Sequence, residues 1–207
     1  MGIVGNMHKA HPFADRWNHN TRWYPRIGEI VSGHQVVLDV GCGDGTLAGH
    51  LASLGHQVIG VDRDSTILPS DAPNTHFVLG DAVSLPFEND SFDAVTAVMM
   101  LHHTHQELAL VEMRRVLKPG GVMVICGTAK DRAPSEMLRS LADVPENLIS
   151  RVGTTAWEPG TVKLDATQSW RQTRATIFEM LPGARWERIP GWRYLAVWQR
   201  PDTDQRC

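Results

Sequence analysis

Three closely spaced glycines, with acids beside them, are the residues of this 207-residue sequence with the clearest chemical potential. Gly41, Gly43 and Gly45 come just after an apolar run at residues 36–38 and just before a helical spacing of leucines. Glycine allows the backbone to turn sharply and a ligand to approach without meeting a Cβ. A strand, a glycine turn and a helix in this order predict a pocket for a nucleotide-like ligand.

The spacing and charge of this loop narrow the choice of ligand. Dinucleotide-binding loops have the pattern G-x-G-x-x-G, whereas this loop is G-x-G-x-G, with Thr46 where the third glycine would fall. Asp44 places a carboxylate inside the turn, where it would repel a pyrophosphate at the helix N-terminus but not a cationic ligand. The loop therefore favours a cationic ligand.

An acid at the end of the next predicted strand extends the pattern. Residues 57–61 are typical of a buried strand, and Asp62 follows them about 20 residues past the first glycine. At that distance a strand-end acid hydrogen-bonds ribose hydroxyls in folds of this kind. Arg63 comes next and is predicted to flank the base, with a solvated arginine as the alternative.

The run from Asp39 to Gly45, followed by Asp62, Asp81 and the turn at residues 117–121, resembles the class I S-adenosylmethionine-dependent methyltransferases. The resemblance implies a Rossmann-like, doubly wound α/β fold. Its seven-stranded sheet is expected to be mostly parallel, with one antiparallel strand near the C-terminus. The implied cofactor is S-adenosyl-L-methionine.

The resemblance also implies which residues hold this cofactor. Asp81 and the backbone N–H of Ala82 offer the adjacent acceptor and donor that an adenine needs, although Asp81 could instead cap a turn. Asp39 and Asp44 add negative field toward a positively charged cofactor. The predicted cofactor-binding set is Tyr24, Asp39, Gly41, Cys42, Gly43, Gly45, Asp62, Arg63, Asp81, Ala82 and Met99.

Two adjacent histidines fall where a methyl acceptor would have to lie. His102 and His103 follow the predicted fourth strand, and an imidazole with a pKa near ~6.5 could take a proton from an attacking hydroxyl or amine. Both are therefore candidate catalytic residues. A positioning or packing role is the alternative, because alignment and water exclusion can supply most of the acceleration. Adjacent histidines without a nearby acid or cysteine do not favour a metal site.

Hydrophobic periodicity predicts the elements that position these residues. Helices are expected at residues 46–54, from a Thr104-x-x-Glu107 capping box to about Leu117, at residues 133–141, and from a Ser169-x-x-Gln172 box to Leu181. Residues 145–163 look irregular. Further strands are expected at residues 75–78, 91–98, 122–126, 186–189 and 193–199, the last two as a hairpin.

The ends of the chain are predicted to cover the acceptor. Residues 1–33 form an arm, with a helix near residues 25–31, that could act as a lid or could anchor a loose terminus. The domain proper is residues 34–207, divided into a core (33–127), an acceptor-side segment (128–185) and closing strands (186–200).

Aromatic and basic residues gather in these same end segments. All seven tryptophans lie outside residues 33–127, so the arm and the Trp157 region could form an aromatic acceptor pocket. Trp186, Trp192 and Trp198 are expected to pack the last strands. Arginines also cluster near the C-terminus and predict a solvated face, with recognition of an acidic substrate as the alternative: Arg171, Arg174, Arg185, Arg188 and Arg193.

Composition limits the other possibilities. A hydrophobic content of 42% in 207 residues suits one domain, and a net charge of -3 gives no support for a nucleic-acid partner. Three widely spaced cysteines without a C-x-x-C pair argue against a disulfide framework and fit a reducing cytoplasm. The longest apolar run, residues 94–101, is far below the ~20 residues of a membrane span, so no membrane partner is expected.

These observations predict an enzyme that transfers the methyl group of S-adenosylmethionine to a small-molecule acceptor, on oxygen or nitrogen, by in-line displacement. Natural-product biosynthesis is one possible setting. One alternative is a non-catalytic protein that binds the same cofactor, since a binding site does not by itself establish turnover. The other is a nicotinamide-dependent oxidoreductase, which the loop spacing and Asp44 disfavour.

Overall fold

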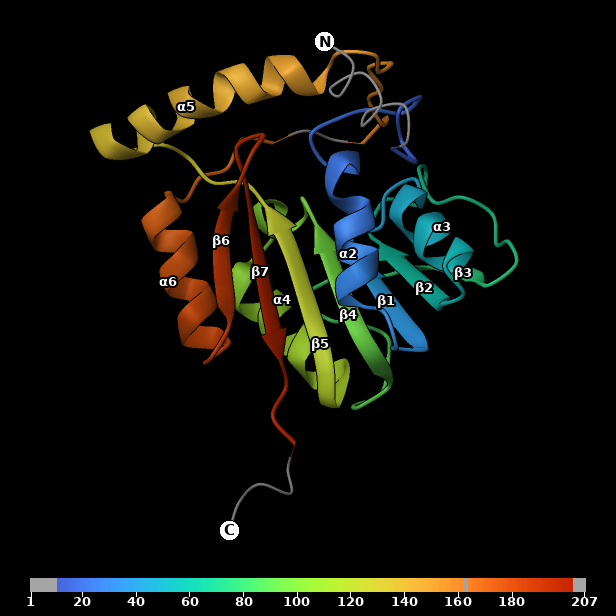
Figure 1. Cartoon of the computed structure of the whole chain (residues 1–207). Coiled ribbons are helices and arrows are strands. Elements are labelled where there is room, and N and C mark those ends of the chain that lie inside the picture. Colours follow the sequence, from blue (N-terminus) through green and yellow to red (C-terminus); the bar gives the residue numbers. More distant parts are fainter. Residues whose placement is uncertain (1–10, 162–163, 203–207) are drawn as a thin grey trace.

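A single twisted sheet of seven strands organises the computed structural model, which describes residues 11–161 and 164–202 (Figure 1). The strand order is β3-β2-β1-β4-β5-β7-β6, and β7 is the strand that runs antiparallel to both of its neighbours. The strands are β1 Val36–Val40, β2 Gln57–Asp62, β3 Thr75–Leu79, β4 Phe92–Val98, β5 Leu117–Gly127, β6 Arg185–Ile189 and β7 Arg193–Gln199. The predicted fold class is confirmed. The order reverses between β1 and β4, which is where such sheets bind ligands.

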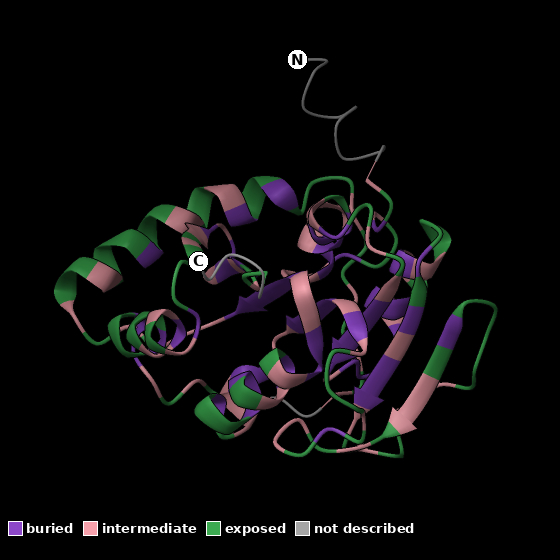
Figure 2. Cartoon of the chain, turned by 90° about the horizontal axis from the view of Figure 1, so that it is seen from below, coloured by how far each residue is buried: buried purple, intermediate pink, exposed green. Residues whose placement is uncertain are grey.

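Helices cover both faces of the sheet and bury its apolar side chains. On one face, α2 (Tyr24–Ile30) and α3 (Thr46–Ser53) pack over β1, together with Phe13 from the arm. On the other face, α4 (Gln106–Val116) and α6 (Trp170–Met180) pack against the sheet and each other. The central strands are accordingly buried on both sides and are drawn in purple in Figure 2. This explains why their sequences are continuous apolar runs rather than alternating patterns.

Most predicted elements of the core are present, but the start of α4 was predicted wrongly. The helix begins at Gln106 after His105, which makes no side-chain capping bond, so Thr104 does not form the expected box. Thr104 has an extended backbone and closes the short η2 turn, Leu101–His103. The capping box at Ser169 and Gln172 is confirmed. The Ser169 hydroxyl accepts from the Gln172 backbone N–H, and the Gln172 side-chain oxygen accepts from the Ser169 backbone N–H.

Helix α5 departs furthest from the prediction. It spans Pro134–Ser150, with Pro145 inside it, where the sequence predicted a short helix followed by an irregular stretch. It buries its polar side, including Ser140 and Asn147, and exposes apolar residues such as Leu138 (71%) and Leu141 (65%). The Trp192 indole donates to the Ser140 carbonyl, and the Arg188 guanidinium donates to the Ser140 hydroxyl. These polar contacts hold the helix above the end of β6 and the start of β7 (Figure 1).

The arm is part of the folded domain where it is described. The backbone N–H of Trp17 donates to the Thr155 carbonyl, and the backbone N–H of Trp157 donates to the Trp17 carbonyl. Residues 155–157 therefore pair with the arm. Residues 1–10 of the predicted arm and Cys207 lie outside the described residues. Within the described ranges, no helix combines the length and apolar character needed to cross a membrane.

Candidate cofactor and acceptor site

A cavity of about 780 Å³ lies at the carboxyl ends of the strands, between the glycine loop, the arm and residues 157–161 and 164–166. It brings together most of the predicted site residues. Those that line it are Tyr24, Gly41, Cys42, Gly43, Asp62, Arg63, Asp81, Ala82, Met99, His102 and His103. Two predicted residues, Asp39 and Gly45, do not line it.

The glycine loop is folded tightly against the end of β2. The N–H groups of Gly41 and Cys42 both donate to the Val61 carbonyl, at 2.8 and 3.1 Å. Gly41 has a φ of +70°, and a Cβ there would lie 2.5 Å from Cβ of Met100. Both the left-handed backbone and the close approach therefore require glycine at this position.

Asp62 occupies the cavity wall in a fixed orientation. One carboxylate oxygen accepts from the Gly43 N–H and the other from the Asp64 N–H, each at 3.0 Å. A carboxylate oxygen can accept more than one hydrogen bond, so both oxygens keep capacity for a ligand. Two adjacent hydroxyls, as in a ribose, match this pair of acceptors.

Asp39 contributes charge from beneath the loop. It is 2% exposed, and its Oδ1 accepts from the Thr96 hydroxyl at 2.8 Å. Its Oδ2 is buried and has no hydrogen-bond partner among the described residues. Burial raises the pKa of this carboxyl to about 7, and the charges of Asp62 and Asp44 contribute to the shift. A cation bound in the loop would offset this clustering of acids.

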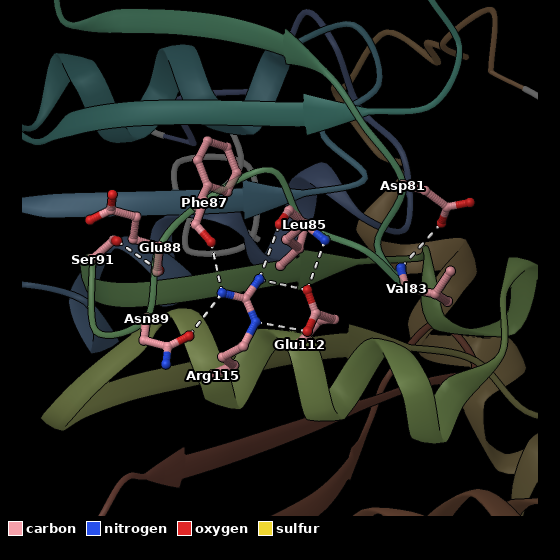
Figure 3. Close-up of polar contacts among 9 residues, drawn as sticks. All are labelled: Asp81, Val83, Leu85, Phe87, Glu88, Asn89, Ser91, Glu112 and Arg115. Atoms are coloured by element: carbon pink, nitrogen blue, oxygen red, sulfur yellow. Dashed lines mark hydrogen bonds and ion pairs between the residues drawn. The ribbon is translucent and has the colours of Figure 1, made fainter.

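The loop that carries Asp81 is anchored from α4 (Figure 3). Glu112 and Arg115 form an ion pair, and Glu112 also accepts from the Leu85 N–H at 2.9 Å. Arg115 donates to the carbonyls of Leu85 and Phe87. Asp81 accepts from the Val83 N–H at 3.1 Å, so the turn-capping role that the sequence left open is present. Because the carboxylate also lines the cavity, this bond does not exclude a ligand contact.

The methionines and histidines after β4 form the next part of the cavity wall. Met99 has a φ of +55°, and its N–H donates to the Cys126 carbonyl at 2.7 Å. Burial, with the charges of His103 and Arg193, lowers the pKa of His102 to about 4. The pKa of His103 is also lowered, again mainly by burial. Both imidazoles are therefore neutral near pH 7, and His102 is a weak proton acceptor that is better suited to hydrogen bonding.

The arm supplies an opposite wall that is rich in amides. Asn18, His19 and Asn20 line the cavity beside Tyr24 and face a segment that includes Trp157. Tyr24 is buried against Phe13, with the two rings at right angles and 5.3 Å between centroids. Burial raises the pKa of the Tyr24 hydroxyl, so it remains a neutral donor. The arm therefore both anchors itself to the core and borders the site.

Arg193 is a cavity residue that the sequence analysis assigned to a solvated face. Arg171, Arg174 and Arg185 are exposed as expected. Arg188 is instead half-buried and lies over the Trp170 ring, and Arg193 is half-buried and lines the cavity. The one sequence signal for this cavity position is that Arg193 begins the predicted last strand. The place of that strand beside β5 depends on pairing between distant residues, which the sequence does not show.

Gly45 is required for packing rather than for the cavity. Its φ is +74°, and a Cβ there would lie 2.7 Å from the Phe77 ring and 2.9 Å from Pro69. Among the three loop glycines, Gly41 and Gly43 line the site and Gly45 fixes the start of α3 against β3.

Comparisons with known proteins find methyltransferases. A family profile described as a methyltransferase domain matches residues 38–125. An uncharacterized methyltransferase of Mycobacterium bovis is 28% identical over 193 residues, covering 89% of this chain and 98% of the relative. The ubiquinone/menaquinone biosynthesis C-methyltransferase of Pseudomonas putida is 34% identical over 153 residues, covering 68% of this chain and 55% of the relative.

Solved structures share the fold. The Burkholderia thailandensis 1,6-didemethyltoxoflavin-N1-methyltransferase, solved with bound 1,6-didemethyltoxoflavin and S-adenosylhomocysteine, superposes with a TM-score of 0.61 at 18% identity, covering 95% of this chain and 82% of that one. The [4+2]-cyclase SpnF superposes with a TM-score of 0.65 at 16% identity, covering 90% of this chain and 84% of that one. At these identities the likeness concerns the fold alone.

Proposed function

Since this chain belongs to the class I S-adenosylmethionine-dependent methyltransferases, we propose that it transfers the methyl group to a small molecule bound in the cavity beside Met99 and His102. The enzyme class and the cofactor follow from the family. The acceptor class and the residue roles are the proposal.

The observation that carries the proposal is the acidic, glycine-rich loop at one end of the cavity. Asp39, Asp44 and Asp62 surround the backbone of Gly41 and Gly43, and the buried Asp39 oxygen has no partner among the described residues. A nucleoside with a positive sulfonium and ammonium offsets this charge, whereas a pyrophosphate would add to it. The residues present therefore fit S-adenosylmethionine.

Each part of the site has a task in this proposal. Asp62 accepts from the ribose hydroxyls, while Asp81 and the Ala82 N–H meet the adenine. When bound, the cofactor supplies an electrophilic methyl group on sulfur. The chain must then align the acceptor and exclude water, which can supply much of the rate. Met100 and Trp157 provide apolar lining, and the neutral imidazoles of His102 and His103 orient the acceptor by hydrogen bonds.

The test is calorimetric titration of S-adenosylmethionine into wild type and Asp62→Ala. We expect a loss of about 2 kcal/mol, or about 30-fold in affinity, because two hydrogen bonds to a charged acceptor are removed. Asp64→Ala is the matched control, since Asp64 also lines the cavity but bonds to Thr66. A change below threefold is expected for the control. Equal affinity for wild type and Asp62→Ala would contradict the assignment.

Methyl release distinguishes this function from cofactor binding without turnover. The cyclase in the same fold shows that the fold alone does not specify methyl transfer. Transfer of labelled methyl to a compound in a metabolite pool, dependent on Asp62, supports the enzyme. Binding of the cofactor with no transfer to any compound would favour the alternative.

A further inference from the structure

Arg193 places a positive charge at the acceptor end of the cavity. Its Nε donates to Asn20 Oδ1 at 2.9 Å, and its Nη1 donates to the carbonyls of Gly191 and Trp192 at 3.1 and 3.3 Å. Burial lowers the pKa of this guanidinium, but arginine remains protonated under all ordinary conditions. The side chain is therefore a half-buried cation that neutral partners hold in place.

No carboxylate of the described residues lies within ion-pair distance of Arg193. Its Nη2 also makes no hydrogen bond within the part of the chain that the structure describes. Buried charges in proteins are normally paired, because an unpaired charge has a large desolvation cost. The other charged groups at this end, Lys130, Glu158 and Asp165, are exposed at the rim.

The sheet fixes where Arg193 lies relative to the cofactor end. Val98 at the end of β4 pairs with Cys126 in β5, and Gly127 pairs with Tyr194 in β7. The end of β4 and the start of the antiparallel strand β7 are thus two strand spacings apart, about 10 Å. A group bound by Arg193 would belong to the far end of a small acceptor whose reactive atom lies near Met99.

The neighbouring imidazoles do not compete for this charge, and the acid whose charge raises the pKa of Arg193, Glu158, is exposed and lies beyond ion-pair distance. Burial is the main cause that lowers the pKa of His19 to about 4, as it does for His102, and Arg193 adds to both shifts. Both imidazoles are neutral and can donate to or accept from a ligand without supplying a counter-charge. Asn18 and Asn20 add amide groups on the same side.

We infer that the methyl acceptor carries an oxyanion, a carboxylate or a phosphate, which pairs with Arg193. A guanidinium binds such groups through strong charge-assisted hydrogen bonds. The inference rests on the proposed function and adds the charge of the substrate to it. It assigns to Arg193 the selection of anionic over neutral acceptors.

Paired acids and amides test this selection. Benzoate and benzamide, cinnamate and cinnamamide, and phenyl phosphate are titrated into the complex with S-adenosylhomocysteine. We expect one or more oxyanions to bind about tenfold tighter than the neutral partner, and Arg193→Gln to reduce that preference to below threefold. Comparison of benzoate with phenyl phosphate separates a carboxylate from a phosphate. Arg185→Gln, an exposed arginine on β6, is the matched control and should keep the preference.

Two further measurements make the outcome decisive. Arg193→Gln should bind S-adenosylhomocysteine within about twofold of wild type, which separates a lost acceptor site from a lost fold. Arg193→Lys keeps the charge and should retain part of the preference if the glutamine variant does not fold. Acids and amides that bind alike, or no oxyanion that binds while the cofactor does, would overturn the inference. Failure of wild type to bind the cofactor would instead refute the proposed function.

Discussion

Asp39→Asn tests the claim that buried acids prepare the loop for a cation. In the free protein the pKa of Asp39 is raised from 3.8 to about 7, because burial disfavours the ionised form. The folded state therefore holds the proton more tightly than the unfolded state between these values. The free energy of unfolding contributed by Asp39 is fully present below about pH 4 and is lost as the pH rises through about 7.

The size of the effect follows from the shift. About three pKa units at about 1.4 kcal/mol each give a loss of up to about 4 kcal/mol between pH 4 and pH 8. Asparagine does not titrate, so Asp39→Asn should not lose this stability. As the pH rises from 4 to 8, the unfolding free energy of the variant should therefore rise relative to that of wild type by up to about 4 kcal/mol.

Urea denaturation of the cofactor-free proteins, at intervals from pH 4 to pH 8, measures this difference. Saturating S-adenosylmethionine provides the control, because a bound cation should stabilise the ionised carboxylate and flatten the pH dependence in wild type. The variant should also bind the cofactor more weakly. A difference that stays constant within about 1 kcal/mol across this range would refute the reasoning.

Four other substitutions test separate parts of the structure. Gly41→Ala should lower the unfolding free energy by about 1–3 kcal/mol in urea, because φ is +70° and the new Cβ meets Met100; an unchanged midpoint would contradict the loop geometry. Glu112→Gln should weaken cofactor binding a few-fold in calorimetry by loosening the adjacent loop, and unaltered binding would count against that role. His102→Gln should leave the shape of the kcat profile from pH 6 to pH 9 unchanged, since its pKa of about 4 keeps it neutral there; loss of a limb would restore the general-base hypothesis. Leu148→Ser on the exposed side of α5 should change the unfolding free energy by less than about 0.5 kcal/mol, and a loss above 1.5 kcal/mol would mean that this side packs inward.

The core of the fold could be predicted from the sequence because its signals are local. Continuous apolar runs marked β1 and β4, and the spacing between Gly41 and Asp62 placed two candidate cofactor-binding residues at adjacent strand ends. The pairing of β1 with β2 then brings Gly43 and Asp62 into hydrogen-bond contact. The predicted positions and the observed geometry agree here.

The acceptor side could not be predicted in the same way, since it depends on contacts between distant segments. The helix predicted at residues 133–141 in fact continues through Pro145 to Ser150, into the stretch predicted to be irregular. The polar contacts from Trp192 to Ser140 that hold α5 join residues 52 positions apart. Arg193 enters the cavity only because β7 inserts between β5 and β6.

A crystal structure of the complex with S-adenosylhomocysteine tests the central claim most directly. The account predicts both ribose hydroxyls within hydrogen-bond distance of the Asp62 carboxylate, the adenine beside Asp81 and Ala82, and the sulfur at the end of the cavity bordered by Met99. A nucleoside bound elsewhere, or one whose ribose makes no contact with Asp62, would contradict it.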